Sequence, residues 1–346
     1  MSKRRDRHRF SATGGATGDF TASVSAAAQT ALARHHTYAL LSQLYLQGPT
    51  PSLLPYVQAI PELAQALPPA LAPDAAAAEH YHLFGLSLFP YASAFVSEGG
   101  LLGGSITGAV AASYAEAGFK AELSSTAADH IGCQLAFLAF LNMREFMEWS
   151  VPTTDAAHDI RKRQLDFLHN HVLDWMAPFA VALQRQEQRF FATLGDLTLV
   201  FISAHLADLT SEDECASKVD LPVYFQLDAH REDEAPSLQM LAAYLTTPYK
   251  SGFSLTRNDI SWLARHIRQP RGFGGRRQML LALMESTQRY GRLEELFTLL
   301  DSEAIAWHES YNEFTIEHPN IGPYVKNWAG KLGATRLYLA RFRAQL

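Results

Sequence analysis

Cysteine is scarce in this sequence of 346 residues. Its two cysteines, Cys133 and Cys215, lie far apart in the chain and form no CxxC motif. A disulfide framework or a cysteine-based zinc site needs more cysteines at closer spacing. Both are therefore excluded, and the composition fits a reducing compartment.

Long apolar runs are also missing. No uncharged apolar run reaches the roughly 18–20 residues that cross a bilayer. The stretch Lys3–Arg9 holds paired arginines like those of twin-arginine export signals, but residues 11–28 are rich in Gly, Thr, Ala and Ser and lack a leucine-rich hydrophobic region. We therefore predict a disordered basic tail over residues 1–25 and a cytoplasmic protein that does not insert into a membrane.

Catalytic motifs are absent as well. The sequence contains no GxSxG, no Walker loop and no GxGxxG after a strand. The pairs His80/His82 and His169/His171 have a spacing of two, which points their side chains in different directions on a helix, so we expect no metal site. The formal net charge of -6 does not favour nucleic acid or an anionic membrane as the main partner.

What the sequence does contain is helical spacing of apolar residues, which make up 48% of the chain. Residues 24–47 carry an apolar stripe, and the glycines of residues 99–108 predict a loop, followed by a helix that ends at Gly118. Residues 127–149, with N-cap candidates at Ser124–Thr126, are apolar nearly all round, which is typical of the central helix of a bundle. Two amphipathic helices follow, with Pro178 between them. Apart from Val223–Phe225 strand signals are almost absent, so the predicted fold is all-α.

Charge divides the chain into two parts. Residues 211–236 hold eight acids against Lys218 and Arg231, which is typical of a solvated linker. We therefore predict a helical core over residues 26–210, an acidic linker over 211–236 and a C-terminal helical extension over 237–346.

Two groups of residues are candidates for binding. Gly274, Gly275, Arg276 and Arg277 combine glycines and arginines at a predicted helix start, where free amides and the helix dipole favour an anion. The same pattern fits an interhelical turn with two solvated arginines, which we prefer. Asp129 and His130 lie at the predicted start of the central helix, where a carboxylate contributes about 0.3–1 kcal/mol against the dipole. The residues alone thus indicate a helical bundle without a catalytic signature.

The order of several segments resembles the TorD/DmsD/NarJ family of molybdoenzyme maturation chaperones. The matching segments are Tyr81–Gly85 (YHLFG), Leu88–Ser93 (LFPYAS), Ser97–Gly100 (SEGG), Tyr114–Phe119 (YAEAGF), Ala127–Ile131 (AADHI), Gln134–Phe137 (QLAF), Phe167–Phe179 and Phe190–Phe191. Residues 248–310 resemble the extra helical tail of longer members. The sequence departs from the family at three carboxylates, because Ala127–Ala128 replaces Glu-Pro, Gln134 replaces a Glu, and Ala92 stands where a Glu is frequent.

The resemblance implies a TorD-like helical bundle that is not an enzyme. Such a chaperone binds the twin-arginine leader and the apo form of a molybdopterin-dependent catalytic subunit, and it assists cofactor insertion before export or assembly. It implies no cofactor of its own beyond weak guanosine nucleotide or molybdopterin binding. The alternatives are a nucleotide-binding helical switch and a general helical scaffold. The sequence leaves open which enzyme is the client and whether the chain is a monomer or a dimer.

The resemblance also suggests which residues form the client groove. Apolar side chains would take the hydrophobic region of the leader, and acids would take its arginines. For the aromatic candidates the alternative is ordinary core packing, and for Glu98 it is a solvated loop acid. The candidates are Tyr81, Phe84, Tyr91, Glu98, Asp129 and His130.

Overall fold

The computed structural model describes residues 25–68, 72–120, 126–149, 155–211 and 237–344. These residues form helices throughout, and their only β-type pairing is an isolated bridge between Tyr91 and His130. The all-α prediction is therefore confirmed. Cys215, the Val223–Phe225 run, the basic tail and most of the acidic linker lie outside the described residues.

The first part of the chain holds most of the helices. In chain order they are α1 (Ala26–Gln47), α2 (Leu54–Gln58), α3 (Pro61–Ala66), α4 (Pro73–His80), the π-helical segment η1 (Tyr81–Ser87), α5 (Ala92–Val96), α6 (Ser105–Ala117), α7 (Ile131–Trp149), α8 (Asp155–Phe167), the π-helical segment η2 (Leu168–Val172), α9 (Leu173–Gln184) and α10 (Arg189–Ser211).

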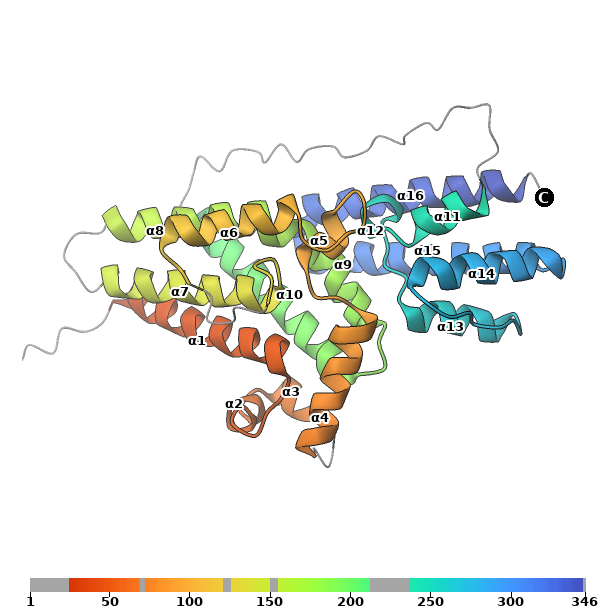
Figure 1. Cartoon of the computed structure of the whole chain (residues 1–346). Coiled ribbons are helices and arrows are strands. Elements are labelled where there is room, and N and C mark those ends of the chain that lie inside the picture. Colours follow the sequence, from red (N-terminus) through yellow and green to blue (C-terminus); the bar gives the residue numbers. More distant parts are fainter. Residues whose placement is uncertain (1–24, 69–71, 121–125, 150–154, 212–236, 345–346) are drawn as a thin grey trace, which may run out of the picture.

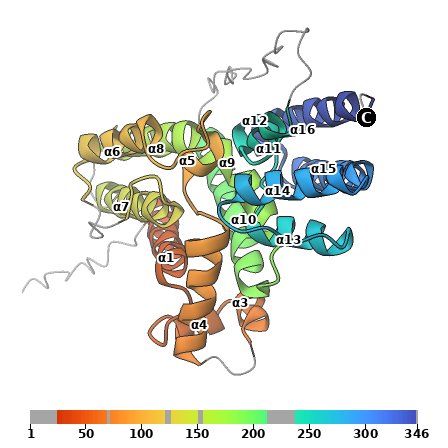
Figure 2. The ribbon, with the colours of Figure 1, turned by 45° about the vertical axis from the view of Figure 1, so that its right-hand side comes forward.

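The C-terminal helices lie beside α9 and away from α1 and α7 (Figures 1 and 2). They are α11 (Leu238–Leu245), α12 (Pro248–Ser251), α13 (Arg257–His266), α14 (Arg276–Arg289), α15 (Leu293–Glu317), the 3₁₀ turn η3 (Pro319–Ile321) and α16 (Gly322–Arg343). Helices α15 and α16 pack against each other, and both contact α9.

Helix α1 begins and ends with ordinary capping. The Ser25 hydroxyl accepts a hydrogen bond from the Ala28 amide, and Gly48, with φ of 72°, donates its amide to the Leu44 carbonyl. Helix α1 packs along α7, where the Ser42 hydroxyl donates to the Gly132 carbonyl at 2.7 Å. A Cβ at position 132 would lie 2.5 Å from the Leu46 side chain, so glycine permits this close approach.

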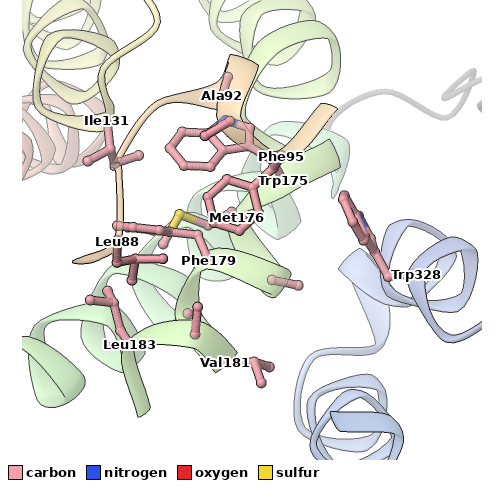
Figure 3. Packing of buried hydrophobic residues seen from close by; sticks show 14 of the residues in the cluster. Leu88, Ala92, Phe95, Ile131, Trp175, Met176, Phe179, Val181, Leu183 and Trp328 are labelled. Atoms are coloured by element: carbon pink, nitrogen blue, oxygen red, sulfur yellow. The ribbon is translucent and has the colours of Figure 1, made fainter. Parts of the chain in front are cut away.

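Helix α9 forms the centre of the core. Trp175 and Phe179 are fully buried and face Leu88 and Phe95 from the segment that precedes and forms α5 (Figure 3). Helix α9 also contacts α10, α15 and α16. Three parts of the chain therefore share one core around a single helix.

The predicted break at Pro178 is wrong, because Pro178 lies inside α9. A proline has no amide hydrogen, so the carbonyl one turn earlier, that of Asp174, loses its helical donor. The indole Nε1 of Trp328 in α16 donates to that carbonyl at 2.6 Å instead. The preceding helix is a succession of α8, the π-helical segment η2 and α9, and the chain turns only at residues 185–188.

A buried polar network joins α1, α7, α8 and α10. Glu145, with no exposed surface, accepts hydrogen bonds from the Arg161 guanidinium and the Gln164 amide, at 3.1 and 2.8 Å. The Gln164 carbonyl oxygen meets His205 Nε2 at 2.8 Å, and His205 Nδ1 meets the Tyr38 hydroxyl at 2.8 Å. A satisfied network of this kind fixes how the four helices pack.

Candidate functional site

Two distant segments meet at the bridge between Tyr91 and His130. The Ile131 amide donates to the Pro90 carbonyl at 2.9 Å, and the Ala92 amide donates to the Asp129 carbonyl at 3.0 Å. Helix α7 therefore starts at Ile131 and not at Ala127, while the N-cap candidates Ser124 and Ser125 lie outside the described residues. Asp129 and His130 precede the helix and pair with residues 90–92, and His130 also accepts from the first turn of α7, through its carbonyl from the Gln134 amide at 3.0 Å and through its ring from the Gly132 amide.

Asp129 is a buried anchor for the segment after Tyr91. The residue has no exposed surface, and its carboxylate accepts from the Ser93 amide at 3.0 Å and from the Thr107 hydroxyl at 2.6 Å. These donors belong to the first turns of α5 and α6. The carboxylate therefore ties the starts of two helices together, and none of its atoms faces solvent in this structure.

His130 is nearly buried beside Tyr91. The two rings make an edge contact with centroids 4.9 Å apart. His130 Nδ1 accepts a hydrogen bond from the Gly132 amide at 3.0 Å, so a neutral ring carries its proton on Nε2. The pKa of His130 is lowered to about 4, mainly by burial and also by nearby His80, while Asp129 acts in the opposite direction. The ring is therefore neutral at physiological pH.

His80 lies near this bridge, although the sequence analysis considered it only with His82 as a metal ligand and not as a client-binding residue. Its Nε2 lies 2.9 Å from the Tyr45 carbonyl oxygen, its ring contacts the ring of Phe84, and burial lowers its pKa. Only its electrostatic effect on His130 connects it to the bridge.

Phe84 and Tyr81 have different surroundings, although both lie in η1. Phe84 is 6% exposed, and its ring contacts those of Tyr45, Phe179 and Phe191, which is ordinary core packing. Tyr81 is 63% exposed and lies against Gly85. Contact with a client is therefore open to Tyr81, whereas Phe84 supports the segment from beneath.

Glu98 lies apart from the bridge, on the loop between α5 and α6. Its carboxylate accepts a hydrogen bond from the Tyr249 hydroxyl of α12 at 3.4 Å. Gly100 on the same loop packs against Thr247. The structure thus brings Tyr91, Asp129 and His130 together, and it places Glu98 beside the C-terminal helices.

One of three comparisons with known proteins gives a match. The family model of the nitrate reductase delta subunit matches residues 50–181. The match covers less than half of the chain and supports the resemblance to the NarJ/TorD-type chaperones over these residues. No curated protein and no solved structure gives a significant match.

The nitrate reductase delta subunit family consists of NarJ/TorD-type chaperones, so the match supports a role in molybdoenzyme maturation in general terms. The match runs from just before α2 into α9 and includes all the candidate groove residues. The assignment of these six residues to a client groove stays a prediction, as does the resemblance outside residues 50–181.

The glycine–arginine segment forms the turn before α14, and part of the predicted anion cradle is occupied by contacts within the chain. The Gly275 amide already donates to the Gln278 side chain at 3.0 Å. The guanidinium of Arg276 turns inward and donates to the Leu255 carbonyl at 3.3 Å, and only Arg277 of the two arginines is exposed. The preferred interpretation of an interhelical turn thus describes Gly274–Arg277, with one arginine solvated and not two. Nucleotide binding stays a prediction.

Helix α10 is the one described helix that is long and apolar enough to cross a membrane. It packs against α9, α8 and α3 in the bundle, and its residues Phe191, Leu194 and Ile202 belong to the core. Core helices of soluble proteins pass the same test of length and composition. Among the described residues, no group of three or more His, Cys, Asp or Glu is arranged to hold a metal ion.

Proposed function

We propose that this protein binds the twin-arginine leader and the apo form of a molybdoenzyme catalytic subunit in the cytoplasm, and that it holds the enzyme for cofactor insertion. The observation that carries the proposal is that four large apolar side chains within the matched region are exposed. Tyr81, Leu86, Leu101 and Leu102 are 63, 42, 74 and 51% exposed. Folded proteins usually leave large apolar side chains exposed close together where they bind a partner.

These side chains come from two segments that flank the Tyr91–His130 bridge. Tyr81 and Leu86 belong to η1, and Leu101 and Leu102 belong to the loop between α5 and α6. π-Helical segments are rare and frequently occur at functional sites. Apolar side chains on both segments suit the hydrophobic region of a leader peptide.

The acid that takes a leader arginine is Glu98 in this proposal. Its carboxylate is exposed, and the neighbouring Leu101 side chain folds back over Gly99. A charged and an apolar contact therefore lie within a few residues of one loop. Asp129 acts from beneath as a positioning residue, because it holds the starts of α5 and α6 that border this loop.

Isothermal titration with leader peptides tests the proposal. We expect a twin-arginine leader of a molybdoenzyme from the same genome to bind, and its lysine-pair version to bind at least tenfold more weakly, because lysine loses the bidentate contact. Glu98→Gln should weaken binding about five- to tenfold, since a hydrogen bond to a charged group contributes about 1.5–3 kcal/mol and solvent screens an exposed one.

Glu116→Gln is the matched control, because Glu116 is an exposed acid on α6 outside the loop. Equal effects of the two substitutions would exclude a specific role for Glu98. If no leader binds at all, the leader-binding proposal fails, and recognition of the mature enzyme or a scaffold role replaces it.

A further inference from the structure

The charge of the chain is strongly segregated. Residues 257–292, which comprise α13, α14 and the turns beside them, contain eight arginines and only two acids, Asp259 and Glu285, a formal charge of +6. The whole chain carries -6, so the remaining residues carry -12. A small negative net charge therefore conceals a strongly basic unit.

Most arginines of this basic unit have no ion-pair partner among the described residues. Arg276 is folded inward, and Arg292 pairs with Glu295. Elsewhere in the C-terminal helices two of the three arginines are paired, Arg336 with Asp301 and Arg343 with Glu294. The exposed arginines without such a partner are Arg257, Arg265, Arg268, Arg271, Arg277 and Arg289.

Exposed aromatic side chains accompany these arginines. Phe273 is 88% exposed on the loop between α13 and α14, between Gly272 and Gly274, whose φ angles are 69° and 101°. Tyr290 is 66% exposed at the turn after α14, and Trp262 is 36% exposed on α13. Each lies within three residues of an unpaired arginine. Isolated aromatic residues next to cations are typical of proteins that dock on a lipid–water interface.

We propose that the basic unit of α13 and α14 docks on an anionic lipid surface. The arginines would contact acidic headgroups, and Phe273 would enter the interface from its glycine-flanked loop. The unit lies at the end of the molecule away from α1 and α7 (Figure 1), so docking leaves η1 and the loop after α5 accessible. The negative remainder of the chain is repelled by the same lipids, which orients the molecule.

The geometry favours lipid over a polynucleotide. The three aromatic residues lie on three different elements, so they form no continuous platform for stacked bases. A bilayer needs only separate contacts with headgroups.

Co-sedimentation of the full chain with vesicles tests this proposal. We expect binding to phosphatidylcholine vesicles with 30 mol% phosphatidylglycerol, none to pure phosphatidylcholine, and strong weakening in about 0.5 M NaCl. The triple substitution Arg265→Gln, Arg277→Gln and Arg289→Gln should weaken binding about 100-fold, at about fivefold for each arginine. Phe273→Ala should weaken it about five- to tenfold at both salt concentrations.

Matched controls come from α16. Arg336→Gln removes a paired arginine, and Leu337→Ala removes an exposed apolar side chain outside the basic unit, so both should bind like the wild type. Absence of wild-type binding to anionic vesicles, or unchanged binding of the triple variant, would refute the proposal. Tighter binding to single-stranded DNA than to vesicles would also overturn it. The triple variant should keep its affinity for a leader peptide, which separates this surface from the client site.

Discussion

The role of Asp129 gives the sharpest prediction. A direct contact with a client arginine requires the negative charge at the surface, whereas a positioning role requires only hydrogen-bond acceptors at the right places. Asp129 has no exposed surface and accepts from the Ser93 amide and the Thr107 hydroxyl. The substitutions Asp129→Asn and Asp129→Ala separate the two roles.

The expected magnitudes follow from the two bonds. Asp129→Ala leaves the buried Ser93 amide without its acceptor and removes the partner of Thr107. At about 1.5–3 kcal/mol for each hydrogen bond to a charged group, the loss is about 3–5 kcal/mol. Asp129→Asn keeps an oxygen for the Ser93 amide, and its amide group can donate to the Thr107 hydroxyl. We therefore expect Asp129→Asn to cost only about 1–2 kcal/mol.

Urea unfolding measures these costs, and titration with a leader peptide measures binding. The positioning role predicts that Asp129→Asn binds nearly as tightly as the wild type, and that Asp129→Ala loses stability and affinity together. Thr107→Val is the matched control for one bond and should cost about 1–2 kcal/mol. If Asp129→Asn keeps its stability but binds the leader peptide more than tenfold more weakly, the positioning role is refuted. A direct contact between Asp129 and a client arginine would then be the better explanation.

Three further predictions concern the bundle. The pKa of His130 is about 4 in the folded chain and about 6.5 in the unfolded chain, so the unfolded chain binds more protons between these pH values. The free energy of unfolding should therefore fall by up to about 3 kcal/mol as the pH drops from 6.5 to 4. Urea unfolding at several pH values should show a smaller pH dependence for His130→Gln. Gly132→Ala should destabilise the chain by about 1–3 kcal/mol in urea, since the new Cβ would meet Leu46, and an unchanged midpoint would contradict the close packing of α1 on α7. Glu145→Ala should cost about 2–4 kcal/mol in the same assay, because Arg161 and Gln164 both lose their buried acceptor while Arg161 keeps its pairing with Asp208; a cost below about 1 kcal/mol would show that the network is not essential.

The sequence predicted helices well where the signals are local. The end of α6 at Gly118 was predicted, and the structure confirms it with a left-handed glycine at φ of 72°. The start of α7 was wrong because the chain enters this helix through a bridge to residues 90–92, about forty positions away, while Ser124–Thr126 look like caps. The turn predicted at Pro178 was wrong because a distant indole, that of Trp328, supplies the missing donor.

The candidate site shows the same limit. Motif resemblance selected residues that the structure brings together, since Tyr91 pairs with His130 and Asp129 bonds to the residue after Ala92. It did not distinguish an exposed side chain from a buried one within a single segment, so Tyr81 and Phe84 looked equivalent. Exposure depends on which side of η1 faces α9 and α10, and the irregular spacing of a π-helix does not reveal this.

The C-terminal helices contact both α9 and the loop that carries the candidate residue Glu98, although the family match ends inside α9. The Trp328 indole satisfies the Asp174 carbonyl of α9, and the Tyr249 hydroxyl donates to Glu98. The Lys331 ammonium lies 4.4 Å from the ring centroids of both Tyr249 and Trp328, and this pair of cation–π contacts ties α12 to α16. A chain cut after residue 211 would expose the carbonyl in the core helix and release the loop that carries Glu98. The position of the loop that carries Glu98 therefore depends on helices outside the matched region.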